Sequence, residues 1–276
     1  MRYLISTACD QKFEDFLIND WLRSLKDNVD LSNTDILVLD FGLSENAKNV
    51  LMENNVMLKE SRISGKIVNA RFAELTKFLR ENPQYEQILM CDSGDLIFQR
   101  SISNLFEIHS DTFKVVCEDY KVPMDVFLMK TDLPKKLKKE IKRILSERKM
   151  INAGFLIGPK DGFIKMCDFI VSTMKDLNTW GMDQLLINYY LYKNGFIELD
   201  KDYNFIPTTH LGGFSIKRGV FYFKDGKKIA VVHNAGSKKM FRPIKNFGYG
   251  ETKNRPKHLL IYLLRIFYNT ASFLKR

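Results

Sequence analysis

Two acidic residues flank a short turn in the first third of the chain. Asp92 and Asp95 enclose Ser93-Gly94, directly after the apolar run at 87–91. Two carboxylates on one tight turn can hold a hard cation such as Mg²⁺ or Mn²⁺ and leave positions free for phosphate oxygens. The turn is therefore a candidate metal site. Asp and Gly are also common in turns for conformational reasons alone, so a purely structural turn is the alternative.

A histidine follows a second apolar run late in the chain. His233 comes directly after residues 229–232, and Gly236 and Lys239 follow it closely. An imidazole nitrogen beside carboxylates favours Mn²⁺ over Mg²⁺. Gly236 lets the backbone approach an anion, and Lys239 can neutralise a diphosphate as a point charge. The alternative is a histidine with a structural role only.

Two shorter polar motifs lie between these clusters. Asn152-Ala153-Gly154 precedes the apolar run 155–158, and Asp183-Gln184 opens a predicted helix. Taken singly, the first fits a turn and the second fits an N-terminal helix cap equally well. These two motifs become informative only when their order along the chain, together with the other two clusters, is considered.

The elements that must position these residues alternate between strand and helix. Apolar runs predict buried strands at 2–9, 35–41, 56–59 and 87–91, and apolar periodicity predicts helices at 13–25, 45–54 and 69–80. This alternation predicts an α/β fold with a mostly parallel, Rossmann-like central sheet flanked by helices. The second half is mixed, with strands near 113–117, 154–157 and 229–232 and helices near 161–175 and 181–193. Ligands of such sheets bind at the carboxyl ends of strands, where Asp10 and Asp92 stand.

The ordered set of motifs resembles the glycosyltransferases of the GT-A fold, most closely the family 8 type that includes bacterial lipooligosaccharide galactosyltransferases. The resemblance covers roughly residues 1–250. It rests on STACDQKF at 6–13, NARF at 69–72, the acidic turn, NxG at 152–154, DQ at 183–184, DYN at 202–204 and HxxGxxK at 233–239.

The resemblance implies a role for each matched residue. It implies that Asp10 contacts the uracil of the donor and that Asp92, Asp95 and His233 bind the metal. It places the transferred sugar and the reacting carbon near Asn152, Asp183 and Gln184. The donor-binding residues that it implies are Thr7, Ala8, Asp10, Arg71, Asp92, Gly154, Gly236 and Lys239.

The chain departs from the family pattern at two points. The acidic pair is spaced Asp-x-x-Asp, one residue wider than the usual DxD, so Asp95 is the safer ligand of the two. The Pro-Trp that usually follows HxxGxxK is missing, and Phe241-Arg242-Pro243 stands nearby. These departures indicate a divergent relative.

The resemblance implies a metal-dependent transferase that moves a hexose from a nucleotide-sugar, in this case a UDP-sugar, to a saccharide or lipid-linked acceptor in cell-surface glycan synthesis. It implies retention of the anomeric configuration. Gln184 is a poor nucleophile, and Asp183 could orient substrate or act as the base of an inverting enzyme. A sugar nucleotidyltransferase is a rival, but residues 6–13 lack its Gly-rich loop. A non-catalytic binding protein is disfavoured by intact Asp95, His233 and Lys239.

The net charge of +10 is concentrated in two segments. Residues 134–150 hold eight Lys/Arg and two Glu, and residues 251–276 hold six Lys/Arg and one Glu. Local basicity of this kind suits an anionic membrane surface, although solvated helix faces are the alternative. We expect no nucleic-acid partner. The oligomeric state is left open.

The C-terminal segment combines this charge with an apolar stripe at 259–267. We therefore predict a GT-A domain at 1–250 and a basic amphipathic tail at 251–276 that lies on the membrane. Residues 135–149 are either a second membrane contact or a lid near the acceptor. A terminal helix packed on the domain or on a second subunit is the alternative. Four cysteines without a CxxC pair and an N-terminus without a signal peptide favour a cytoplasmic protein, peripheral on the cytosolic face of the membrane.

Overall fold

The computed structural model describes most of the chain. The described residues are 2–62, 64–122, 127–128, 131–210, 213–236, 242, 244, 246–250, 263 and 266–267. The predicted tail therefore lies outside them except for Leu263, Ile266 and Phe267, whose exposed fractions are 52%, 44% and 60%.

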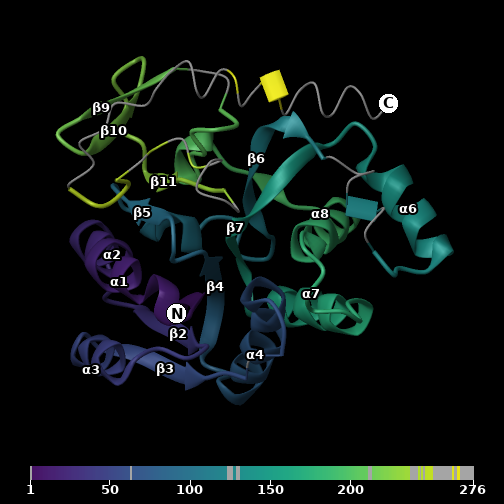
Figure 1. The fold of residues 1–276 in the computed structure, drawn as a ribbon, viewed down its shortest axis with the longest axis horizontal. Coiled ribbons are helices and arrows are strands. Elements are labelled where there is room, and N and C mark those ends of the chain that lie inside the picture. Colours follow the sequence, from purple (N-terminus) through teal and green to yellow (C-terminus); the bar gives the residue numbers. More distant parts are fainter. Residues whose placement is uncertain are drawn as a thin grey trace.

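A seven-stranded sheet forms the centre of the molecule (Figure 1). Its strand order is β3-β2-β1-β4-β7-β6-β8. All neighbouring pairs are parallel except those of β7, which runs antiparallel to β4 and β6. The strands are β1 (Arg2–Cys9), β2 (Thr34–Asp40), β3 (Val56–Glu60), β4 (Tyr85–Cys91), β6 (Lys114–Lys121), β7 (Lys149–Pro159) and β8 (Ile197–Glu198). The predicted α/β fold with a mostly parallel sheet is confirmed.

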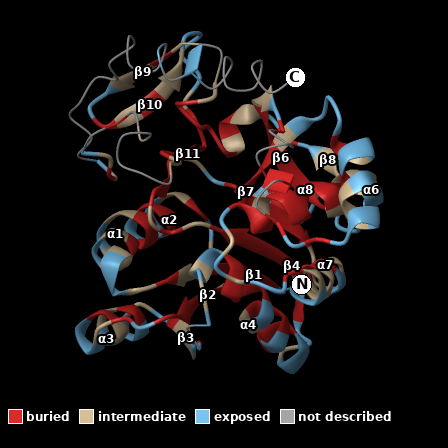
Figure 2. Cartoon of the chain, turned by 45° about the vertical axis from the view of Figure 1, so that its right-hand side comes forward, coloured by how far each residue is buried: buried red, intermediate tan, exposed pale blue. Residues whose placement is uncertain are grey.

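Helices cover both faces of this sheet, which explains why its central strands are apolar almost throughout (Figure 2). One core layer contains the apolar sides of α4 (Ile67–Glu81), α7 (Lys160–Thr173) and α8 (Met182–Asn194). The opposite layer contains those of α3 (Glu45–Glu53) and of the helical segment after β1. Predicted strand and helix positions in the first hundred residues agree with these elements to within two residues, except for the helix at 13–25.

The helical segment after β1 is less regular than the predicted single helix. It consists of a 3-10 turn (Gln11–Phe13), α1 (Glu14–Phe16), a π-helical stretch (Leu17–Leu22) and α2 (Arg23–Asn28). Leu17, Trp21 and Leu25, spaced four residues apart, are nevertheless all fully buried. The predicted apolar face is thus correct, but its period is not purely α-helical.

A small third core is attached to one end of the sheet. It gathers apolar residues from β5 (Leu96–Phe98), β9 (Phe214–Lys217), β10 (Val220–Phe223) and β11 (Val231–His233). Strand β11 pairs antiparallel with β5, which lies far from it in the sequence. Because these strands are short, their pairing was not evident from the sequence. It is the pairing that positions the metal-site candidates.

The basic helix α6 (Lys135–Leu145) has its apolar face inside the domain. Ile141 and Leu145 are fully buried. These two apolar residues therefore belong to the core of the domain and leave the basic surface of the helix for any outside contact. Its surface consists of basic residues, including Lys135, Lys136 and Arg143.

Two further findings concern the described part of the chain. All four cysteines are buried and unpaired. Every described helix is too short or too polar to cross a bilayer.

Lys114 is fully buried at the start of β6, near the edge of the sheet remote from the metal candidates. Its ammonium donates to Gln87 Oε1 at 2.9 Å and to the carbonyl oxygens of Ile108 and His109 at 2.9 and 3.3 Å. Burial lowers the pKa of Lys114 from 10.5 to about 8. The ammonium therefore joins the loop before β6 to strand β4 at a cost in desolvation.

We predict a pH-dependent effect of Lys114→Met on stability. Between about pH 8 and pH 10.5 the unfolded lysine binds a proton that the folded one has released, so the contribution of Lys114 to unfolding free energy rises with pH. The limiting slope is about 1.4 kcal/mol per pH unit. Urea denaturation at pH 8, 9 and 10 measures this. The unfolding free energy of wild type minus that of the variant should become more positive as the pH rises. A constant difference would contradict the prediction.

Candidate metal centre

Sheet pairing brings the acidic turn and the histidine together. In the antiparallel ladder of β11 with β5, His233 is paired with Leu96, and Asp95 directly precedes Leu96. The backbone N–H of Asn234 continues the ladder by donating to the carbonyl oxygen of Asp95 at 2.8 Å. Asp92 lies at the carboxyl end of β4, the strand next to β1. Both ends of the acidic turn thus face the end of β11.

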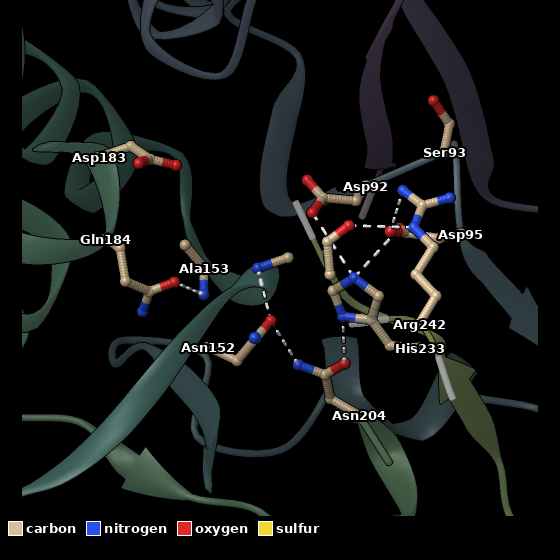
Figure 3. Close-up of polar contacts among 12 residues, drawn as sticks. Asp92, Ser93, Asp95, Asn152, Ala153, Asp183, Gln184, Asn204, His233 and Arg242 are labelled. Atoms are coloured by element: carbon tan, nitrogen blue, oxygen red, sulfur yellow. Dashed lines mark hydrogen bonds and ion pairs between the residues drawn. The ribbon is translucent and has the colours of Figure 1, made fainter. Parts of the chain in front are cut away.

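The three side chains form one compact cluster (Figure 3). The Nε2 atom of His233 is 3.2 Å from Asp95 Oδ1 and 3.7 Å from Asp92 Oδ2. One ligand atom from each residue lies within 4.8 Å of the other two. Two carboxylate oxygens and one imidazole nitrogen at such separations suit a divalent cation of the Mn²⁺ type. The wider Asp-x-x-Asp spacing therefore still converges both carboxylates on the histidine.

Gly154 provides the space for this cluster. Its carbonyl oxygen accepts from the N–H of Asp92 at 3.0 Å, which holds β7 against the acidic turn. A Cβ atom at position 154 would lie 2.3 Å from His233 Cε1 and 2.8 Å from Asp92 Oδ2. Both separations are too short for real atoms, so the cluster has this geometry only because residue 154 has no side chain.

Arg71 joins the cluster to the N-terminus of α8. From its buried position on α4, its guanidinium lies 2.6 Å from Asp92 Oδ1 and 3.8 Å from Asp183 Oδ2. Asp183 is in the first turn of α8, after Gly181, whose φ of 79° is favourable only for glycine. Ion pairs therefore connect three of the predicted site residues, Arg71, Asp92 and Asp183.

Arg242 is a second cation at the site, and the sequence did not identify it as a site residue. Its Nη2 atom lies 2.9 Å from Asp95 Oδ2, and its Nε donates to the carbonyl oxygen of Gly236 at 3.0 Å. The guanidinium also lies over the ring of Phe13, 5.9 Å from the centroid. Arg242 lies where the chain departs from the family pattern, so none of the matched motifs includes it.

The charges of the cluster shift one another. Burial disfavours the ionised form of Asp92, but Arg71 and His233 hold the pKa of this carboxyl below its ordinary value. Burial also opposes protonation of His233, yet Asp95 and Asp92 outweigh it and raise its pKa. For Asp183 burial prevails over Arg71 and raises the pKa. The cluster without metal is thus balanced by two guanidiniums and the imidazole.

The end of β1 carries two buried oxygen atoms without hydrogen-bond partners in the described structure. They are Thr7 Oγ1 and Asp10 Oδ1. Ala8, between them, accepts at its carbonyl oxygen from the hydroxyl of Ser93 at 3.3 Å, which links β1 to the acidic turn. Unsatisfied buried acceptors are rare because each costs about 1–3 kcal/mol. Both atoms are therefore suited to a ligand that donates hydrogen bonds.

Asn152 and Gln184 are engaged with their surroundings. Asn152 is buried and donates to Glu118 Oε1 at 2.9 Å. Gln184 accepts from the N–H of Ala153 at 3.2 Å and donates to the carbonyl oxygen of Ile151. The amide of Gln184 therefore joins α8 to β7, which suits a positioning role better than an attack on substrate.

The described residues do not include every predicted site residue. Gly236 is described and accepts from Arg242, whereas Lys239 lies outside them. Three contributors to the site were not among the predicted residues: Glu118, Asn204 and Arg242. Asn204 belonged to a matched motif without an assigned role, and Glu118 could have been noticed as an acid directly after the apolar run 115–117.

Comparison with known proteins establishes the fold. No protein-family model matches the chain, and no curated protein matches it in sequence. Among solved structures, the WbbM bifunctional glycosyltransferase in its apo form has a TM-score of 0.58 and 15% identity, covering 96% of this chain and 52% of WbbM. The chain thus spans about half the length of WbbM.

Two solved structures of LgtC match over nearly their full length. The galactosyltransferase LgtC in complex with donor and acceptor sugar analogues has a TM-score of 0.56 and 17% identity, covering 96% of this chain and 95% of LgtC. An active-site mutant of LgtC has a TM-score of 0.57 and 16% identity, covering 97% and 95%. At such identities the likeness shows the fold alone, and the GT-A fold implied by the sequence resemblance is confirmed.

Proposed function

We propose that this chain is a metal-dependent glycosyltransferase that takes a hexose from a UDP-sugar. The observation that carries the proposal is the Asp92, Asp95 and His233 cluster at the strand ends of a GT-A fold. Ligands of such sheets bind at this edge. LgtC, which shares the fold, was solved with donor and acceptor sugar analogues. The same two classes of ligand are proposed for this chain.

The end of β1 is proposed to bind the base of the donor. Asp10 Oδ1 and Thr7 Oγ1 are buried acceptors that lack partners. The imide N–H of uracil is a donor that would satisfy Asp10. Because a site built to hydrogen-bond a donor group discriminates strongly against analogues that lack it, Asp10 favours a uridine nucleotide.

The arginines and the histidine prepare the site for a diphosphate. A bound divalent cation would supply positive charge to the leaving diphosphate. The ligands Asp92, Asp95 and His233 would hold it, and Nε2 of His233 must be free of its proton to do so. Two cations are proposed to face the phosphates. They are Lys239 and Arg242, which is paired with Asp95 in this structure. Charge that grows on the leaving group is then stabilised by groups already in place.

The hexose is proposed to lie between Asp183 and β7. Asp183 is held by Arg71, Asn152 lies on β7, and Gln184 is hydrogen-bonded to that strand from α8. We propose retention of configuration, by analogy with the family that the sequence resembles. An inverting reaction would need Asp183 as a base, and the raised pKa of that buried carboxyl is compatible with this role.

The test is hydrolysis of UDP-sugars without acceptor. A panel of UDP-glucose, UDP-galactose and their N-acetyl derivatives is incubated with Mn²⁺, with Mg²⁺ and with excess chelator. We expect release of UDP from at least one donor with Mn²⁺ and none with chelator. Release of pyrophosphate from UTP and a sugar phosphate would instead indicate a nucleotidyltransferase. Binding of donor without turnover would indicate a non-catalytic protein.

We predict that Lys239→Ala lowers kcat far more than it weakens acceptor binding. Lys239 is proposed to act on charge that appears as the sugar–phosphate bond breaks, and such contacts contribute to kcat. A loss on the order of 100-fold is typical of a transition-state charge contact. Lys239→Arg, which keeps the charge, should retain most activity. Unchanged turnover in the Ala variant would remove Lys239 from the site.

We propose that the enzyme works on the cytosolic face of a membrane, where a glycan or lipid-linked acceptor resides. The domain 1–250 carries the chemistry, and the tail 251–276 binds anionic lipid. Helix α6 would add an electrostatic contact only, because its apolar residues are buried. Each Lys or Arg near an anionic surface adds about 1 kcal/mol.

We predict that a chain ending at residue 250 no longer co-sediments with vesicles of phosphatidylglycerol and phosphatidylcholine but still hydrolyses donor. The full chain should bind these vesicles less as salt is raised, because the contact is largely electrostatic. Neutral vesicles are the control. If the full chain ignores anionic vesicles, the tail is a packed terminal helix, and if truncation unfolds the protein, it belongs to the core.

A further inference from the structure

A row of buried polar side chains runs from the metal cluster to strand β6. His233 contacts Asn204 at 3.1 Å, Asn204 contacts Asn152 at 3.2 Å, and Asn152 contacts Glu118 at 2.9 Å. All four residues are between 2% and 7% exposed. Figure 3 shows Asn152, Asn204 and His233 joined end to end. Burying polar groups is costly unless each is paired, so a fully paired row indicates a function.

One backbone group fixes the direction of the hydrogen bonds in this row. The N–H of Gly154 can only donate, and it lies 2.9 Å from Asn152 Oδ1. That atom of the amide must therefore be the oxygen. The NH₂ group of Asn152 then points to Glu118 Oε1, which accepts. The N–H of Gly154 and the carboxylate of Glu118 therefore allow only one orientation of the Asn152 amide.

The same constraint reaches His233 through Asn204. Because Asn152 Oδ1 is an acceptor, Asn204 turns its NH₂ group towards it, and its own oxygen faces His233 Nδ1. An oxygen there can only accept, so Nδ1 must carry a proton. Nε2 also faces acceptors, because Asp95 and Asp92 hold the imidazolium form in the protein without metal. With Nδ1 committed to Asn204, Nε2 is the nitrogen whose proton a cation would replace.

We propose that Glu118, Asn152 and Asn204 form a positioning relay that fixes His233 in its Nδ1–H tautomer and presents the Nε2 lone pair to a divalent cation. The cation belongs to the proposed function, but the proton on Nδ1 is a property of the protein without metal. Glu118 is the terminus of the relay, and its hydrogen bonds reach His233 through the two amides. Partners of this kind typically change metal affinity by about 10- to 100-fold.

The tautomer is measured first, by NMR on protein with ¹⁵N-labelled histidine and no metal. The chain has four histidines, and His233→Asn identifies the signal of interest. We expect a proton on Nδ1 in wild type, whether or not Nε2 is protonated as well. Asn204→Leu and Glu118→Leu should move His233 towards the Nε2–H form. Glu118→Gln keeps an acceptor for Asn152 and should keep the wild-type pattern.

Metal affinity is the second measurement, by calorimetry with Mn²⁺ alone. Asn204→Leu and Glu118→Leu should weaken binding about 10- to 100-fold, and Glu118→Gln should stay within about threefold of wild type. Asp119→Asn is the matched control, because Asp119 is the neighbouring buried acid but pairs with Lys201 and His210. It should change neither readout.

Two results would overturn the relay. One is a wild-type spectrum with His233 in the Nε2–H form, which needs no variant to fold. The other is a pair of folded Leu variants with wild-type tautomer and metal affinity. Failure of the proposed function is separate: wild-type protein that binds no Mn²⁺ would remove the metal, while the NMR pattern would still decide the relay.

Discussion

Asp95→Asn is expected to abolish metal-dependent nucleotide binding while the protein stays folded. Asp95 is the proposed ligand nearest to His233 Nε2, and the amide that replaces its carboxylate has almost the same shape but no charge. Outer partners of a metal site already change affinity by about 10- to 100-fold, so loss of a charged ligand should exceed that range. Arg242 would keep an oxygen acceptor at position 95.

The measurement is calorimetric binding of UDP with and without Mn²⁺. Wild type should bind UDP much more tightly with the metal, whereas Asp95→Asn should bind equally weakly in both conditions. Asp200→Asn is the control, since Asp200 has an 81% exposed side chain and pairs only at 3.9 Å with Lys227. A variant that retained the stimulation by Mn²⁺ would place the metal elsewhere.

The strands that carry Asp10 and Asp92 were predictable because they are buried on both faces. A parallel strand under two helical layers is apolar at nearly every position, and β4 has only one exposed residue. Runs of this kind are visible without alignment. Their carboxyl ends then identify the edge where chemistry belongs, so the acidic turn was found from local sequence alone.

The contact between Asp95 and His233 could be expected only from the family resemblance. It depends on β5 and β11, strands of three residues each, far apart in the chain. Neither strand is long enough to show a period, and their pairing is set by the small third core. The local sequence pattern identified the acidic turn and the histidine. The pairing of β5 with β11 sets the distance between them.

The remaining members of the site have no local signal. Arg242 reaches Asp95 from a segment where the family pattern is absent. Glu118 follows the short apolar run 115–117 in a strand that also contains Lys114 and Asp119. A charged residue in a buried strand is noticeable, but only the contact with Asn152 shows what it does. Polar networks of this type are defined by distance in space, so the sequence cannot specify them.

Gly154→Ala is expected to destroy the metal centre through a single methyl group. The added Cβ would lie 2.3 Å from His233 Cε1, 2.8 Å from Asp92 Oδ2 and 3.0 Å from Asn152 Oδ1. The histidine cannot retreat freely, because it is buried and hydrogen-bonded to Asn204. Overpacking of this kind costs about 1–3 kcal/mol of stability, which a folded protein can tolerate. Displacement of two ligands should lower Mn²⁺ affinity by more than about 100-fold.

Gly158→Ala separates this effect from simple overpacking. Gly158 is on the same strand, and a Cβ there would lie 2.6 Å from the ring of Phe113, with no metal ligand among its three nearest atoms. Both variants should lose similar stability in urea, but only Gly154→Ala should lose Mn²⁺ binding and metal-dependent donor hydrolysis. Equal loss of metal binding in both would mean that the centre responds to distortion of β7 in general. Wild-type binding in Gly154→Ala would mean that Asp92 and His233 do not share one cation, because the methyl group occupies the space between them.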